Sequence, residues 1–266
     1  MKPRSDSAPG ENFTIMTVGA HRAPVLRAGA GPSLLLLHGE EGFAALRPLI
    51  SQLAPDFSVI APIHPGFGGD PAPDWLERVS DAAMYYLDFC DAIDLRDLHL
   101  VGASMGGWIA ADLATRSTAR LASLSLIAPA GLHVAGATGI DPFLMLDDAA
   151  SRAMFHDPAV ADAALAQVTG DDEDIRLQER VTIARLGWAP RLHDPALRKW
   201  LHRIDVPTLL LWGAQDRLFP PAYATAWQNL LPRARLHLLD ACGHLPHVEQ
   251  TAAAAAALRT QIKALS

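Results

Sequence analysis

The sequence predicts an α/β protein in which a mostly parallel, doubly wound sheet carries a helical cap as an insertion. Two observations predict the sheet, and a third predicts the cap. Short, continuously apolar runs recur along the chain, as expected for strands buried on both faces of a parallel sheet. Helical stretches alternate with these runs, as in doubly wound folds. The alternation stops once, between about residues 132 and 203.

The expected strands are apolar runs, most of them ending in a turn, and the expected helices fall between them. A short antiparallel start is expected at 13–18 and 24–27, followed by strands at 33–39, 57–61, 98–101, 121–127, 208–212 and 235–239. Helices are expected at 44–53, 80–93, 108–115, 222–231 and 250–264. Sequential strand and helix units of this kind form one layered domain with helices on both faces of the sheet.

The interruption predicts a cap. Residues 133–203 hold helical stretches at 157–167 and 174–186 but no comparable strand, so the expected core comprises residues 13–132 and 204–266. Because ligands of open α/β sheets bind at the carboxyl ends of the strands, we expect the cap to cover that edge. Residues 1–12 are polar and contain proline and glycine, which predicts a disordered start.

Composition excludes several classes of function. The chain has 266 residues, of which 50% are hydrophobic and 19% are charged, as in an ordinary globular enzyme. A net charge of −7 and the lack of basic runs disfavour a nucleic-acid partner. The first residues lack the apolar stretch of a secretory signal, and no apolar run is long enough to span a bilayer. With two cysteines, Cys90 and Cys242, and no C-x-x-C pair, we expect reduced thiols and a cytoplasmic protein.

The stretch Gly102-Ala103-Ser104-Met105-Gly106 carries the strongest chemical signal. It lies between the apolar run 98–101 and the helical stretch 108–115, which predicts a strand, a sharp turn and a helix. A G-x-S-x-G pattern in that setting is a nucleophile elbow, where the serine hydroxyl stands exposed above the end of the sheet. Ser104 is therefore the expected nucleophile, although a serine can also serve only as a small turn residue.

A base and an acid follow later strands. His244 comes after the strand at 235–239 through a glycine turn, and Asp216 comes after the strand at 208–212. An alkyl hydroxyl needs a base to take its proton, and the histidine needs an acceptor that holds its tautomer. Because parallel strands end at one edge of a sheet, the fold itself brings the three residues together. Asp240 is a rival acid, but it lies too close to His244 along the chain to come from a separate strand.

Two backbone N–H groups are expected to form an oxyanion hole. The residue after the serine, Met105, supplies one, and Glu40, in the loop His38-Gly39-Glu40-Glu41-Gly42 after an early strand, supplies the other. Two acidic side chains beside an oxyanion are electrostatically unfavourable. We therefore expect the side chains of Glu40 and Glu41 to point away from that site or to contact a cationic group on the substrate.

Six features in order resemble the α/β-hydrolase superfamily. They are His38-Gly39-x-x-Gly42, His64-Pro65-Gly66-Phe67-Gly68, Gly102-x-Ser104-Met105-Gly106-Gly107, the helical insertion, Trp212-Gly213-x-x-Asp216 and Gly243-His244. The resemblance extends from about residue 13 to the C-terminus and is to the lidded branch, which holds esterases, epoxide hydrolases, haloalkane dehalogenases and meta-cleavage-product C–C hydrolases. Epoxide hydrolases and dehalogenases use an aspartate nucleophile, so Ser104 argues against both. His64 departs from the usual Asp-x-Pro-Gly-x-Gly pattern.

The resemblance implies a Ser-His-Asp hydrolase that forms an acyl-enzyme and needs no cofactor. A small carboxylic ester is the first expected substrate, because that is the commonest chemistry for such a triad. The main alternatives are cleavage of a C–C bond in a vinylogous diketone and a non-catalytic small-molecule receptor that retains the triad; a cofactor-independent oxygenase or perhydrolase is a further one. An unperturbed histidine near pKa 6.5 predicts that activity falls in mild acid.

The cap is expected to set specificity. Candidate pocket residues are Phe143, Met145, Phe155, Trp188 and Arg191, of which the arginine could hold a substrate carboxylate. Apolar residues in a cap helix also commonly pack onto the core, and an arginine is commonly exposed, so both interpretations stay open. His244 and His247 lie three apart, but no H-E-x-x-H or carboxylate-rich pattern accompanies them, so no metal is expected. The sequence does not indicate an oligomeric state.

Overall fold

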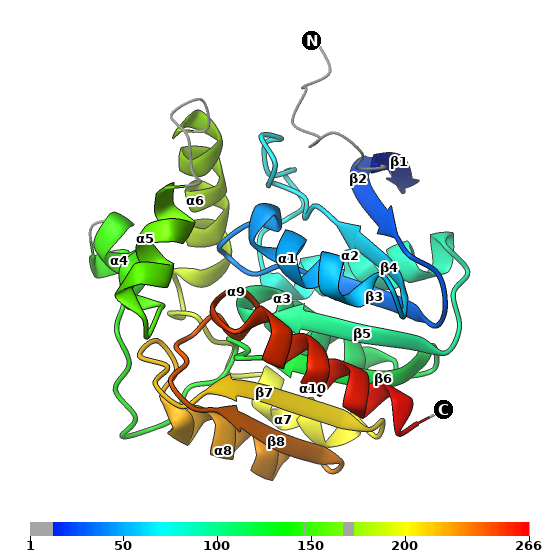
Figure 1. Ribbon diagram of the computed structural model, residues 1–266. Helices are drawn as coiled ribbons and strands as arrows, with labels where there is room; N and C mark the ends of the chain where they lie inside the picture. The colour runs from blue at the N-terminus through cyan, green and yellow to red at the C-terminus, as the bar shows by residue number, and fades with distance from the viewer. Residues whose placement is uncertain (1–12, 146, 167–172, 266) are drawn as a thin grey trace.

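An eight-stranded sheet forms the centre of the computed structural model, which describes residues 13–145, 147–166 and 173–265 (Figure 1). The strands run in the order β1-β2-β4-β3-β5-β6-β7-β8. Their bounds are β1 Phe13–Val18, β2 His21–Ala28, β3 Ser33–Leu37, β4 Ser58–Pro62, β5 Leu98–Ala103, β6 Leu121–Ile127, β7 Thr208–Gly213 and β8 Ala234–Leu239. The first two strands pair antiparallel, β2 pairs antiparallel with β4, and all later pairings are parallel. The predicted fold class is confirmed, and residues 1–12, predicted to be disordered, lie outside the described residues.

Alternate residues of each buried strand face opposite layers. In β3, Leu34 and Leu36 join one apolar cluster, whereas Leu35 and Leu37 join the other. Because both faces are covered, β3 and β7 are apolar at nearly every position rather than at every second one. This explains the continuous apolar runs in the sequence.

Helices cover both faces of the sheet. On one face lie α1 (Arg47–Leu53) and α10 (Thr251–Lys263), which stand in front of the sheet in Figure 1. The other face carries α2 (Val79–Ala92), α3 (Ser104–Arg116) and α8 (Pro221–Leu230), whose buried residues share one apolar cluster. The predicted helix 108–115 begins earlier, at Ser104, so the turn joins strand to helix without a connecting loop.

Between β6 and β7 the chain forms only helices and loops among its described residues. Helices α4 (Asp147–Ala153), α5 (Pro158–Ala166) and α6 (Glu173–Gly187) lie together at one end of the sheet (Figure 1). A short 3-10 helix, η2 (Pro142–Leu144), precedes them. Two further short helices, α7 (Leu197–Trp200) and η4 (Leu201–Arg203), pack against α3 of the core.

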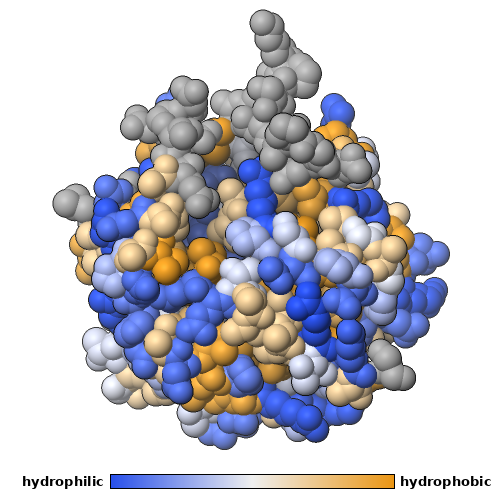
Figure 2. Space-filling view, in the orientation of Figure 1, coloured by the Kyte–Doolittle hydropathy of each residue, from blue (hydrophilic) through white to orange (hydrophobic). Residues whose placement is uncertain are grey.

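The remaining short helices flank the loops that follow β3 and β8. They are the 3-10 helix η1 (Phe43–Leu46) and α9 (Pro246–Glu249), which contact each other. Hydrophobic residues form several separate patches among hydrophilic ones on the face shown in Figure 2. Among the described residues, none of the helices combines the length and the apolar character that a membrane crossing requires.

Candidate active site

Ser104 occupies a strained turn between β5 and α3. Its φ is 43°, in the left-handed region that a non-glycine residue adopts at an energetic cost, and its side chain is almost completely buried. Tight packing around the turn explains the flanking glycines. A Cβ on Gly102 would collide with the backbone of Gly106, and a Cβ on Gly106 would collide with the carbonyls of Leu37 and His38. The sequence therefore fixes Ser104 at the carboxyl end of β5, next to the loop after β3.

Three predicted residues meet at this edge of the sheet. The Oγ of Ser104 lies 2.8 Å from Nε2 of His244, and Nδ1 of His244 lies 2.9 Å from Oδ2 of Asp216. Each of the three is at most 3% exposed, so water competes little for these hydrogen bonds. The chain Ser104–His244–Asp216 has the connectivity that proton transfer from a serine hydroxyl requires.

The loop after β7 fixes the Asp216 carboxylate. Its Oδ1 accepts hydrogen bonds from the backbone N–H groups of Leu218, at 2.8 Å, and Phe219, at 2.9 Å. This leaves Oδ2 free to face His244. The ring of Phe219 packs edge-on against the imidazole with 5.3 Å between centroids, so the same loop also restricts the ring's orientation.

The loop after β8 is held by a carboxylate in α9. Glu249 accepts hydrogen bonds from the backbone N–H groups of Gly243, His156 and Asp157. The N–H of His244 donates to the carbonyl of Met154, at the end of α4. These contacts tie the histidine loop to the segment that joins α4 and α5. Sequence reasoning missed the role of Glu249, because its partners are backbone groups 90 or more residues away, apart from Gly243.

The Glu40 side chain points into the site, which excludes the first expectation, that it points away, and leaves contact with a cationic group as the other. Ser104 donates a hydrogen bond to Oε1 of Glu40 at 2.9 Å, and the N–H of Met105 donates to Oε2 at 3.4 Å. The same Oε1 lies 3.5 Å from Nε2 of His244. A serine hydroxyl has one proton, so while Ser104 donates it to Glu40, His244 must donate through Nε2. An imidazolium, with N–H groups toward both Ser104 and Asp216, satisfies the whole arrangement.

Electrostatics agree with that proton arrangement. Burial alone would lower the pKa of His244, but the charges and hydrogen bonds of Asp216 and Glu40 outweigh it and raise the pKa to about 10. Burial would raise the pKa of Glu40, but its hydrogen bond and charge interaction with His244, and its hydrogen bonds from Ser104 and from its own backbone N–H, lower it to about 2. With Glu40 in the site, His244 is therefore protonated at neutral pH and cannot accept the Ser104 proton.

The pair of Glu40 and His244 is expected to stabilise the native state most between pH 4.5 and 6.5, their ordinary pKa values. The depressed pKa of Glu40 gives a contribution that is lost as the pH falls from 4.5 towards 2. The raised pKa of His244 gives a contribution that is lost as the pH rises from 6.5 towards 10. The measurement is the free energy of urea unfolding of the wild type and of Glu40→Gln, compared at pH values below, within and above the interval from 4.5 to 6.5. The exposed Glu77→Gln variant is the control for net charge, and a difference that does not change with pH would contradict the pairing.

A second acidic residue holds the loop after β3. Glu41 Oε1 lies 2.8 Å from Nε2 of His247 and accepts a hydrogen bond from the N–H of Gly39. The Glu41 carboxylate thus binds His247 and the backbone of its own loop. This contact couples the loop of Glu40 to α9, which follows the His244 loop.

His64, which departs from the usual pattern, supports the same loop from its other side. Its backbone N–H donates to Nε2 of His38, and its ring contacts the His38 carbonyl and the Tyr86 hydroxyl. Burial lowers the pKa of His64 to about 4, and burial followed by the His64 charge lowers that of His38, so both rings are neutral at pH 7. The two rings therefore hold the loop after β3 through hydrogen bonds.

Three of the predicted cap residues gather together. The Arg191 guanidinium lies 4.0 Å from the Trp188 ring centroid and 5.1 Å from that of Phe143, beside the Asp141 carboxylate at 3.5 Å. Phe155 instead packs into the core cluster, with its carbonyl bound by Arg217, and Met145 is half-buried after η2. A cavity of about 250 Å³ is bordered by Arg191 at one part of its wall and by Phe219 at another. Phe219 also packs on His244, but Ser104, Asp216 and His244 themselves do not line this cavity.

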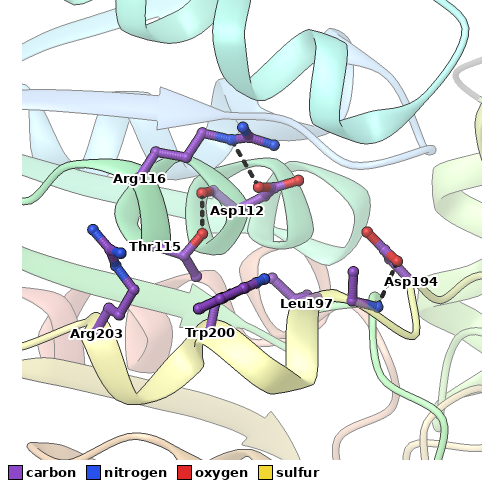
Figure 3. Close-up of a pocket in the computed structure, with 8 residues that line it drawn as sticks. Asp112, Thr115, Arg116, Asp194, Leu197, Trp200 and Arg203 are labelled. Carbon is purple, nitrogen blue, oxygen red and sulfur yellow. Dashed lines mark hydrogen bonds and ion pairs between the residues drawn. The ribbon is translucent and has the colours of Figure 1, made fainter.

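A second cavity of about 260 Å³ lies between α3 and α7 and contains none of the predicted site residues (Figure 3). Asp112, Thr115 and Arg116 border it from the far half of α3. Within 13–145, 147–166 and 173–265, no three His, Cys, Asp or Glu side chains are placed to hold a metal ion. Burial raises the pKa of the Cys242 thiol to about 12, so it is a poor nucleophile beside Ser104.

The chain belongs to the α/β-hydrolase family, whose model matches residues 34–257. A pimeloyl-[acyl-carrier protein] methyl ester esterase of Aromatoleum aromaticum (strain DSM 19018 / LMG 30748 / EbN1) is 33% identical over 81% of this chain and 92% of its own length. A 2-hydroxymuconate semialdehyde hydrolase of Pseudomonas sp. (strain CF600) is 27% identical over 85% of this chain and 84% of its own length.

The similarity to solved structures extends over nearly the whole chain. The 2-hydroxy-6-oxo-6-phenylhexa-2,4-dienoate hydrolase of Rhodococcus sp. strain RHA1 superposes with a TM-score of 0.77 at 25% identity, covering 95% of this chain and 99% of that one. The relatives named here are thus hydrolases, of esters in one case and of dienoate or semialdehyde substrates in the others.

Proposed function

We propose that the protein is a serine hydrolase of small carboxylic esters. The observation that carries the proposal is the continuous hydrogen-bonded chain from Ser104 through His244 to Asp216, at 2.8 and 2.9 Å. The arrangement fits a nucleophile, a base and an orienting acid, each following a different strand of one parallel sheet. The esterase relative, 33% identical, supports an ester substrate.

The reaction begins when Glu40 leaves the site, which removes its negative charge from beside His244. The imidazolium then releases its Nε2 proton to solvent, and Nε2 is free to accept the proton of Ser104. Ser104 Oγ then attacks the carbonyl carbon, and His244 Nε2 takes the proton. The N–H groups of Met105 and Glu40 stabilise the oxyanion, and loss of one such donor typically costs about 3 kcal/mol. His244 returns the proton to the leaving alcohol, and water activated by the same imidazole then hydrolyses the acyl-enzyme.

Residues 133–203 form the cap in this proposal. The 250 Å³ cavity accommodates the acyl or ring portion of the substrate, with Arg191 in its wall. Phe143 and Trp188 pack against the Arg191 guanidinium and hold it in place. Phe155 contributes by packing in the core cluster, and Met145 follows η2 directly before the cap helices.

Cleavage of a C–C bond in a vinylogous diketone is the second candidate. The specific observation in its favour is Arg191, whose buried Nη1 has no hydrogen-bond partner among the described residues. A guanidinium beside a cavity can bind a carboxylate, which a dienoate substrate carries. The Pseudomonas and Rhodococcus relatives support this chemistry.

Two measurements test the proposal. A fluorophosphonate is expected to modify the protein once, at Ser104, as located by peptide mass spectrometry. Turnover of p-nitrophenyl butyrate is expected to exceed that of 2-hydroxy-6-oxo-6-phenylhexa-2,4-dienoate, measured by loss of its yellow colour. The reverse order would favour the C–C hydrolase. Tight ligand binding without turnover of either substrate would favour a receptor.

A further inference from the structure

The carboxylate of Glu40 fills the place where a reacting carboxyl group belongs. Its two oxygens contact the Ser104 hydroxyl, at 2.9 Å, and the Met105 N–H, at 3.4 Å, and one of them lies 3.5 Å from His244 Nε2. The N–H of Glu40 itself, the other expected oxyanion donor, also stabilises this carboxylate. All the polar groups that would bind a substrate carbonyl therefore face a side chain of the same protein.

The same groups are those that a carboxylic acid product would contact. After hydrolysis, the product's two oxygens lie between the serine hydroxyl, the oxyanion donors and the histidine. A glutamate side chain ends in the same planar carboxylate, so Glu40 has the shape and charge of the product head group. Glu40 and the product carboxylate are mutually exclusive because both require the Ser104 hydroxyl, the Met105 N–H and His244.

The loop holds Glu40 in position for this contact. Glu41 anchors the neighbouring residues through Gly39 and His247, and the Gly42 N–H donates to the Gly39 carbonyl. The Glu40 side chain is only 14% exposed, so solvent hydrogen bonds compete little with its contacts in the site. Displacement requires rotation of one side chain and leaves the backbone N–H of Glu40 in place.

We propose that Glu40 is a specificity-determining residue that competes, as an intramolecular carboxylate, with the reacting carboxyl group of the substrate and with the acid product. The proposal rests on the function proposed above. Substrates bind productively only when their remaining contacts displace Glu40. The released acid must compete with the same side chain, so its inhibition of the enzyme is weak.

The expected size of the effect follows from how often Glu40 occupies the site. A ligand that binds only the open form has its apparent affinity reduced by the fraction of time that form is populated. If the site is open about one tenth of the time, removing the carboxylate tightens binding of a carboxylate by about tenfold. Full negative charge on Glu40 adds repulsion against a second carboxylate nearby.

The test compares Glu40→Ala and Glu40→Gln with the wild type, with Glu77→Gln as the matched control. Butyrate binding is measured by isothermal titration calorimetry, which needs no turnover, and kcat/KM is measured with p-nitrophenyl butyrate. We expect the butyrate Kd of Glu40→Ala to fall by about tenfold or more and its kcat/KM to rise. Glu40→Gln should change in the same direction but less, because its neutral amide still fits the space. The control should match the wild type.

The outcomes separate the two proposals. An unchanged or weaker butyrate affinity in both folded variants, checked by circular dichroism, overturns the role of Glu40. A lower kcat in both variants without tighter butyrate binding also overturns it, because Glu40 would then assist the chemistry. If butyrate binding tightens but neither the wild type nor the variants hydrolyse esters, the ester hydrolase proposal fails while the competition by Glu40 stands.

Discussion

The Ser104→Ala variant is expected to hydrolyse p-nitrophenyl butyrate with a kcat/KM at least about a thousandfold below the wild type. Without the hydroxyl there is no atom to form the acyl-enzyme, and His244 has no proton to accept. Residues of such a triad act as a unit, so the remaining members cannot compensate. The loss should fall on turnover, while butyrate binding by calorimetry changes much less, since the oxyanion donors remain.

Ser125→Ala is the matched control for this variant. Ser125 is a buried serine in the neighbouring strand β6, and its hydroxyl has no hydrogen-bond partner among the described residues. Its replacement should leave both activity and fluorophosphonate labelling at the wild-type level. Near-normal hydrolysis by Ser104→Ala, or equal losses in the two variants, would contradict the assignment of Ser104 as the nucleophile.

The sequence predicted the fold because its strongest pattern is set by burial on both faces of the sheet. The runs at 33–37 and 208–212 are apolar at nearly every position, and the structure places them in β3 and β7 with opposite faces in different clusters. The short helices α7, α9 and η4 were not predicted. They span four residues or fewer, which is too short for helical periodicity to appear.

The meeting of Ser104, Asp216 and His244 could be predicted because it depends on topology alone. Each residue follows a parallel strand, and parallel strands end at one edge. Side-chain direction near that edge could not be predicted in the same way. The orientation of Glu40 depends on Ser104, Met105 and His244, which lie more than 60 residues away along the chain.

The cap residues illustrate the same limit. Phe143 and Trp188 were expected to line a pocket or to pack onto the core. In the structure both rings contact the Arg191 guanidinium, although Phe143 and Arg191 are 48 residues apart along the chain. Neither hydropathy nor spacing predicts such a contact. The described helices between Phe143 and Arg191 do not alternate with strands, so the sheet does not determine where they lie. By contrast, Phe155 packs below the histidine loop, a position that depends on how α4 meets the loop after β8.

The carboxylate of Asp216 is expected to matter as much as the nucleophile. In Asp216→Asn, the amide can still accept hydrogen bonds from Leu218 and Phe219 through its oxygen. Its NH₂ group would then face His244 Nδ1 and donate to it, which forces the proton onto Nε2. A histidine in that tautomer cannot accept the Ser104 proton. In serine proteases with the same arrangement this change lowers kcat by about four orders of magnitude, and we expect a loss of similar size here, measured with p-nitrophenyl butyrate.

Asp240→Asn is the matched control, because Asp240 is the rival acid near His244 and its side chain is exposed after β8. It should retain wild-type activity. A large loss in Asp240→Asn with near-normal activity in Asp216→Asn would move the orienting role to Asp240. The loss of kcat in Asp216→Asn can be assigned to the position of the His244 proton only if the variant is as thermally stable as the wild type, which circular dichroism measures. That stability is expected because both backbone hydrogen bonds to the side chain persist and the substituted group keeps its volume.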